Sequence, residues 1–129
     1  MVKGGEILVI AVLVCTGIFI LFDVVTGILK GLYNEGLNST ILRKGLFHKL
    51  SEVLAVIAGW LAEYGAKYVN IHIPIPLLSV VATYICIMEA ISIIENLCEI
   101  NPSLGKLFKP YLAKLKEEQD DINENSNNR

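Results

Sequence analysis

Charged residues are few in this sequence, and two long stretches lack them altogether. Only 19% of the 129 residues are Asp, Glu, Lys or Arg, whereas 53% are hydrophobic, and the mean hydropathy is +0.56. The sixteen residues from Ile7 to Phe22 carry no charge, and no charge lies between His72 and Met88. A soluble domain of this length cannot bury so much apolar surface, because small domains leave a large share of their surface in water. The composition therefore excludes an ordinary soluble domain and indicates a membrane protein.

Groups that perform chemistry are also scarce. The three cysteines, Cys15, Cys86 and Cys98, are odd in number and far apart, which argues against a disulfide framework or a zinc site. The two histidines, His48 and His72, fall near predicted membrane interfaces, where a lone histidine is usually only amphipathic. The sequence offers no Ser-His-Asp set, phosphate-binding glycine loop or cluster of metal ligands. We therefore expect neither an enzyme nor a protein that binds a cofactor, a metal or a nucleic acid.

Three segments are apolar enough to cross a membrane as helices. A helix needs ~20 apolar residues to cross a hydrocarbon core of ~30 Å, and this rule places the spans at about residues 7–29, 53–73 and 77–96. The second span is the weakest, because it contains Glu63 and Lys67. Pro74 and Pro76 end any helix after it, since proline lacks an N–H donor and clashes with the preceding turn. The predicted fold is an all-α membrane protein, with one membrane domain over residues 1–116 that forms homo-oligomers.

Lysine and arginine are concentrated in two connecting regions. The connection between the first two spans and the region after the third span hold most of them: Lys30, Arg43, Lys44, Lys49, Lys106, Lys109, Lys114 and Lys116. With three spans, both regions fall on one side of the membrane. Because basic loops stay in the cytoplasm, the sequence predicts an N-terminus outside and a C-terminus inside.

Both basic regions have the pattern of amphipathic helices that lie on a membrane surface. Apolar residues recur at helical spacing from Asn38 to Val53, and again over residues 102–116. Such helices favour the headgroup zone of an anionic leaflet, so the expected membrane-surface residues are Arg43, Lys44, Lys49, Lys106, Lys109 and Lys114. The alternative is that these helices pack on a partner subunit. Residues 117–129 are acidic, lack apolar periodicity and are predicted to be a disordered tail.

Ionisable residues at membrane depth are the most informative. A charge at the bilayer centre costs at least ~2.5–3.5 kcal/mol, so it normally faces protein or water. In the second span, helical spacing brings Glu52, Glu63 and Lys67 onto one face with Gly59. Glu63 and Lys67 are predicted to pair across one helical turn, and the small residues of this face to allow close helix packing.

The third span has a similar polar stripe, and its members recur at helical spacing: Glu89, Ser92, Asn96 and Glu99. Glu63 and Glu89 are both expected near the membrane midplane. Two interpretations remain open at this point. The polar faces either hold a static bundle together, or they face one another first and line water later.

Four blocks of the sequence, taken in order, resemble the toxin-secretion and phage-lysis holin family. Asp23-Val24-Val25-Thr26-Gly27 is similar to the family's D-x-x-T-G signature. The basic connection with Asn38-Ser39 and Arg43-Lys44-Gly45 follows. Glu89 to Asn96, which includes Ser92 and Glu95, resembles the pattern E-x-x-S-I-x-E-N. The proline-started, lysine-rich segment from Asn101 to Lys116 completes the resemblance, which covers about residues 7–116.

The resemblance implies a function that the spacing alone does not show. Members of that family collect in the bacterial cytoplasmic membrane and then oligomerise abruptly into lesions, through which an endolysin or a large toxin escapes. It implies pore or assembly roles for Asp23, Thr26, Gly27, Glu89, Ser92, Glu95 and Asn96; helical geometry adds Glu52, Gly59, Glu63 and Lys67. An antiholin of the same fold, or a small ion or solute transporter subunit, is the alternative.

Overall fold

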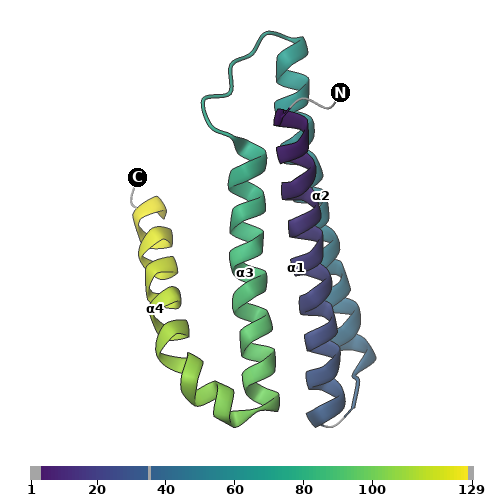
Figure 1. Ribbon diagram of the computed structural model, residues 1–129, viewed down its shortest axis with the longest axis vertical. Helices are drawn as coiled ribbons and strands as arrows, with labels where there is room; N and C mark the ends of the chain where they lie inside the picture. Colours follow the sequence, from purple (N-terminus) through teal and green to yellow (C-terminus); the bar gives the residue numbers. More distant parts are fainter. Residues whose placement is uncertain (1–3, 35, 128–129) are drawn as a thin grey trace.

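The computed structural model describes residues 4–34 and 36–127, and these residues form four helices (Figure 1). The helices are α1 (Gly4–Asn34), α2 (Ser39–Tyr68), α3 (Leu77–Ile100) and α4 (Pro102–Asn127). The described residues contain no strand. The predicted all-α class is therefore confirmed.

The first three helices are long and apolar enough to cross a membrane, by length and composition. With 31, 30 and 24 residues, they extend ~46, ~45 and ~36 Å at ~1.5 Å per residue, against a hydrocarbon core of ~30 Å. Of the three, α2 is the least apolar. The count of three candidate spans agrees with the prediction from sequence.

The second span differs from its predicted bounds at both ends. The amphipathic segment that begins at Asn38 is not a separate surface helix, because α2 runs without a break from Ser39 to Tyr68. The Asn38 side chain caps its start by accepting the backbone N–H groups of Thr40 and Ile41. The helix ends before residue 73, because Asn70 adopts a positive φ of 53° and the Ile71 N–H bonds to the Ala66 carbonyl. This arrangement is a Schellman-type stop.

The last helix is longer than the amphipathic segment predicted over residues 102–116. The side chain of Asn101 accepts the Ser103 N–H and so caps its start. The helix then continues to Asn127, where the sequence predicted a disordered tail. Glutamate has good helix propensity, and this polar stretch contains Glu117, Glu118 and Glu124, so it can remain helical without an apolar stripe. The end of the predicted tail, residues 128–129, lies outside the described residues.

Helix α3 lies at the centre of the bundle and contacts each of the other three helices, whereas α1 and α2 touch each other little. Figure 1 shows the start of α1 and the 69–76 loop at one end, and both the α1–α2 turn and the α3–α4 junction at the other. The two basic connecting regions therefore begin at the same end of the bundle, as three spans require.

The distribution of polar and apolar side chains is inverted relative to that of a soluble protein. Buried positions include the polar residues Thr16, Asp23, Thr26, Glu89 and Asn96, next to a small apolar cluster of Ile20, Val56, Leu78 and Ile85. Large apolar side chains cover the outside of α1, α2 and α3. An apolar surface this extensive marks contact with lipid or with other protein, so the fold places its polar groups where a membrane would not reach them.

Candidate functional site

Polar residues of the three candidate spans meet at one level of the bundle, which we call the polar layer: Asp23 and Thr26 of α1, Lys49 and Glu52 of α2, and Glu89 and Asn96 of α3. Asp23 lies eleven residues before the end of α1, Lys49 ten residues after the start of α2, and Glu89 eleven residues before the end of α3. At ~1.5 Å per residue, each lies ~15–17 Å from the end of the bundle that carries the α1–α2 turn. In a bilayer of ~45 Å with a core of ~30 Å, this depth is inside the hydrocarbon.

Lys49 is the centre of the polar layer and touches a carboxylate on each candidate span. Its Nζ lies 2.8 Å from an Asp23 oxygen, 2.5 Å from a Glu89 oxygen and 3.5 Å from a Glu52 oxygen. The Glu89 side chain is only 2% exposed, and the Lys49 side chain 15%. Charges removed from water are tolerated only when they are paired, so Lys49 is what permits three carboxylates at this depth.

Asn96 completes the layer on the side nearer the α1–α2 turn. Its amide donates hydrogen bonds to Asp23 Oδ1 at 3.2 Å and to Thr26 Oγ1 at 3.1 Å, and the Thr26 hydroxyl donates to the Asp23 carbonyl at 3.0 Å. A Cβ added at Gly27 would lie 3.8 Å from the Asn96 amide nitrogen. The D-x-x-T-G block of α1 and the final asparagine of the α3 block are therefore a single hydrogen-bonded unit.

The polar layer contains more negative than positive groups. Three carboxylates surround one lysine, and His48 adds an ion pair with Glu52 only when it is protonated, with 3.3 Å between Nδ1 and Oε1. Glu52 Oε2 is buried and has no hydrogen bond among the described residues, so its ion pair with Lys49 at 3.5 Å is the contact that compensates its charge. Because three carboxylates share one lysine, their charge is only partly compensated, and this layer would gain free energy from contact with water.

A cavity of about 430 Å³ opens beside the layer, and α4 contributes to its wall. Its lining includes Ser92 and Glu95 of α3 together with the charged groups of the layer. Lys116 of α4 forms an ion pair of 2.5 Å with Glu95, and this carboxylate raises the pKa of the Lys116 ammonium above its usual value. Of the residues in the α3 block, Glu89, Ser92 and Glu95 therefore line the cavity. Glu89 also contacts Lys49 of α2, whereas Asn96 bonds to α1.

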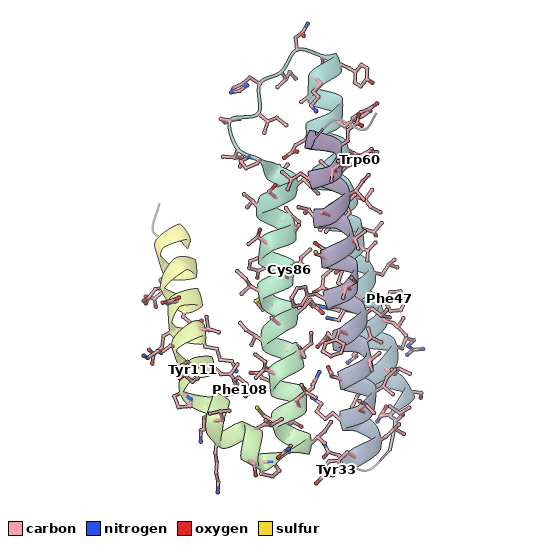
Figure 2. The ribbon with its side chains drawn as sticks, in the orientation of Figure 1. Tyr33, Phe47, Trp60, Cys86, Phe108 and Tyr111 are labelled. Carbon is pink, nitrogen blue, oxygen red and sulfur yellow. The ribbon has the colours of Figure 1, made fainter. Side chains whose placement is uncertain are left out.

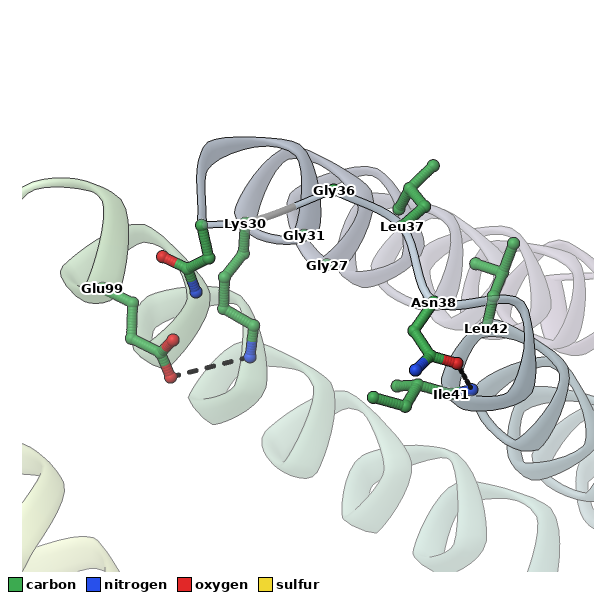
Figure 3. A pocket seen from close by; sticks show the side chains of 10 residues that line it. Gly27, Lys30, Gly31, Gly36, Leu37, Asn38, Ile41, Leu42 and Glu99 are labelled. Carbon is green, nitrogen blue, oxygen red and sulfur yellow. Dashed lines mark hydrogen bonds and ion pairs between the residues drawn. The ribbon is translucent and has the colours of Figure 1, made fainter.

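A larger cavity of about 1050 Å³ lies at the α1–α2 turn (Figure 3). Lys30 of α1 crosses it to pair with Glu99 of α3, with 3.6 Å between the charged atoms. The turn itself is closed by a hydrogen bond from the Gly36 N–H to the Gly31 carbonyl, and Gly36 has a φ of 99°, which favours glycine. Glu99, the last member of the predicted stripe, thus ties α3 to α1 at the end of the bundle.

Glu63 and Lys67 do not form the predicted pair. Glu63 Oε1 instead accepts the backbone N–H of Leu78 at 2.8 Å, which caps the N-terminus of α3, and Lys67 is exposed without an ion pair among the described residues. A carboxylate is favoured at a helix N-terminus because it meets free N–H groups and the positive end of the dipole. This contact also corrects the predicted depth of Glu63: it lies level with the start of α3, ~16 Å along that helix from Glu89.

Gly59 has the close-packing role that its position predicted. It is buried, and a Cβ added there would lie 3.5 Å from the Leu78 Cα. Ala55 and Ala62, which share the predicted small-residue face, are exposed. Val56 is buried in their place, so the contact face of α2 is rotated slightly from the predicted one.

The predicted membrane-surface residues are exposed, with one exception. Arg43, Lys44, Lys106, Lys109 and Lys114 are all on the outside of the molecule. Lys49 is not, and its assignment to the surface is corrected by its contacts in the polar layer. Its distance of three residues from Glu52 was the signal available in the sequence, because it extends the polar face of α2 by one turn.

Comparison with known proteins adds a family match. The family model described as the bacteriophage holin family matches residues 3–117. Neither the curated proteins nor the solved structures contain a match to the chain.

Proposed function

Because the chain belongs to the bacteriophage holin family, we propose that it acts as a holin in the cytoplasmic membrane of a bacterium. Copies of the chain would assemble into lesions through which an endolysin, or in some hosts a large toxin, leaves the cytoplasm. The family is one of membrane proteins that are not enzymes. The observation that carries the proposal is the polar layer, an ionic network enclosed by three apolar helices.

The polar layer stabilises the single chain in the membrane, but its excess of carboxylates also favours a state in which it contacts water. In the single chain, Lys49 and Asn96 pair with Asp23 and Glu89, so that the outer surface can remain apolar and dissolve in lipid. The excess of carboxylates makes these same faces prefer water. When many copies gather, helices that exchange partners can turn these faces toward a shared, water-filled opening while their apolar sides remain in lipid.

The proposed orientation is N-terminus outside and C-terminus inside. It is supported by the two basic regions, which begin at the same end of the bundle, because lysine-rich segments favour the cytoplasmic side. Helix α4 begins at this end and then runs back beside α3 (Figure 1). The exposed lysines nearest its start, Lys106 and Lys109, would meet the anionic inner leaflet.

Induced expression in a bacterium that also produces a cytoplasmic endolysin tests the function. A holin stops growth suddenly and releases the endolysin, so that the culture clears. A transporter changes ion or solute flux without passing proteins, and an antiholin does neither. Either of these two results would overturn the proposal.

Two variants test whether the assembly faces matter for this activity. Glu89→Leu removes the most buried carboxylate of the polar layer, and Gly59→Leu separates α2 from α3. Both should delay or abolish lysis at equal protein levels, whereas Lys44→Met, a change at an exposed site of α2, should not. Wild-type timing in both leucine variants would contradict the role given to these faces.

A further inference from the structure

The last third of α2 carries three aromatic residues in a continuous row, which we call the aromatic ladder: Trp60, Tyr64 and Tyr68. Trp60 and Tyr64 stack with ring centroids 5.5 Å apart, and Tyr68 meets Tyr64 edge to face at 5.2 Å. The two tyrosine hydroxyls are hydrogen-bonded to each other at 2.8 Å. The row therefore presents one apolar surface with a pair of hydroxyl groups toward its end.

All three side chains of the aromatic ladder are exposed. Exposure rises along it, from 38% at Trp60 to 47% at Tyr64 and 72% at Tyr68. The buried residues of α2, Val56 and Gly59, face α3 instead. Large aromatic rings left open in this way need an apolar surrounding for their faces and a polar one for their hydroxyls.

The depth of the ladder in a membrane follows from the length of α2. At ~1.5 Å per residue, Trp60 lies ~32 Å and Tyr68 ~44 Å from the start of the helix. If α2 fills a bilayer of ~45 Å, the far boundary of the ~30 Å hydrocarbon core falls at ~37 Å, level with Tyr64. Figure 2 shows Trp60 toward the end with the 69–76 loop, whereas Tyr33 lies at the opposite end. The ladder thus crosses the boundary between hydrocarbon and headgroups.

The loop that follows is also apolar and exposed. Val69, Ile71 and Ile75 are between 53% and 64% exposed, although they stand in a turn between two helices, where exposed residues are usually polar. Lys67 and His72 are exposed beside them and would reach the headgroups. An apolar loop next to an aromatic row matches the chemistry of one partner, the headgroup boundary of a phospholipid leaflet.

We propose that the aromatic ladder and the 69–76 loop bind the headgroup boundary of the leaflet at their end of the bundle, and that this contact holds α2 across the membrane. The need for an anchor comes from α2 itself, which is the least apolar of the three spans and carries Lys49, Glu52 and Glu63 along one face. An anchored end stops this helix from sliding out toward the basic end of the bundle. The proposal does not depend on lysis activity.

The depth of the ladder can be measured directly, because Trp60 is the only tryptophan in the chain. The full chain is placed in phosphatidylcholine vesicles brominated either near the headgroup or near the end of the acyl chains. Stronger fluorescence quenching by the shallow bromines is the expected result. Stronger quenching by the deep bromines would place the ladder in the core, and absence of quenching by both would mean that protein, such as a second copy, covers it. Either outcome overturns the proposal.

Anchoring is tested separately by the accessibility of the loop. His72→Cys, in a chain whose three native cysteines are replaced by alanine, is labelled with a membrane-impermeant maleimide in intact cells and in inverted vesicles. One of the two preparations will label the parent His72→Cys chain more strongly. Replacing Tyr64 and Tyr68 together by leucine should lower the labelling in that preparation several-fold, whereas tryptophan at both positions should keep it at the level of the parent chain. Replacing Leu54 by isoleucine and Ile57 by leucine, two exposed changes that leave the hydropathy of α2 nearly unchanged, is the matched control and should change little. Equal labelling in the leucine and control variants would refute the anchor.

Discussion

Replacing Lys49 by methionine is the sharpest perturbation of the polar layer. Methionine keeps most of the length of the side chain but removes the one lysine that, among the described residues, contacts Asp23, Glu52 and Glu89. Three carboxylates would then share a site with little access to water. Removing one partner of a buried ion pair costs about 3–5 kcal/mol, because an uncompensated charge stays behind. At about 1.4 kcal/mol for each factor of ten, this cost lowers the folding equilibrium by about two to four powers of ten.

Removing a carboxylate from the polar layer should destabilise the bundle less than removing the lysine does. Glu89→Gln also breaks a contact with Lys49, but the lysine keeps Asp23 and Glu52, and one repelling charge disappears. Its cost should therefore stay near that of a lost charged hydrogen bond, about 1.5–3 kcal/mol. Because carboxylates are in excess, Glu89→Gln combined with Lys49→Met should be more stable than Lys49→Met alone.

The assay is reversible unfolding of the purified protein in mixed micelles, with a denaturing detergent as the titrant and helix content as the signal. Lys44→Met makes the same change of charge at an exposed site on the same helix, and it should lie within about 0.5 kcal/mol of wild type. If Lys49→Met and the Lys44→Met control unfolded at the same concentration of denaturing detergent, the ionic network would not stabilise the bundle.

Substitutions at three further contacts test the packing of the bundle. Asn96→Ala should cost about 1–3 kcal/mol in the same assay, because it leaves buried acceptors on α1 unpaired; a neutral result would contradict the hydrogen-bonded unit. Gly59→Leu should cost about 1–3 kcal/mol through overpacking against Leu78, whereas Gly59→Ala should be tolerated, since its Cβ would reach only ordinary contact at 3.5 Å. Glu63→Ala should cost about 0.5–2 kcal/mol as a lost helix cap, and Lys67→Ala less than about 0.5 kcal/mol; equal costs would instead restore the pair predicted from sequence.

Hydropathy was sufficient to predict the three spans, because a membrane imposes a length and a composition that each helix must meet alone. The burial of Glu89 at depth was predicted for the same reason, because its charge stands out against an apolar background. Gly59 was also predicted, since a small residue on the polar face of a helix allows close packing.

The partners of these residues could not be predicted in the same way. Helical periodicity shows which residues share a face, but it does not fix how far one helix is shifted along its neighbour. Glu63 therefore seemed to pair with Lys67 on its own helix, whereas the structure places it at the start of α3. Lys49 was assigned to the surface by its basic neighbours, although the position of α2 beside α3 brings it to Glu89.

In the proposed mechanism, the polar layer is shielded from water at rest and is exposed to water when lesions form. Thr26, which is 2% exposed inside the layer, and Val25, which is 44% exposed on the apolar side of α1, are each replaced by cysteine in a chain without other cysteines. A charged, membrane-impermeant thiol reagent is added to cells before and after lysis is triggered. We expect Thr26→Cys to react only after triggering, and Val25→Cys, which faces lipid, to react at neither time. Equal reactivity of Thr26→Cys before and after triggering would contradict it.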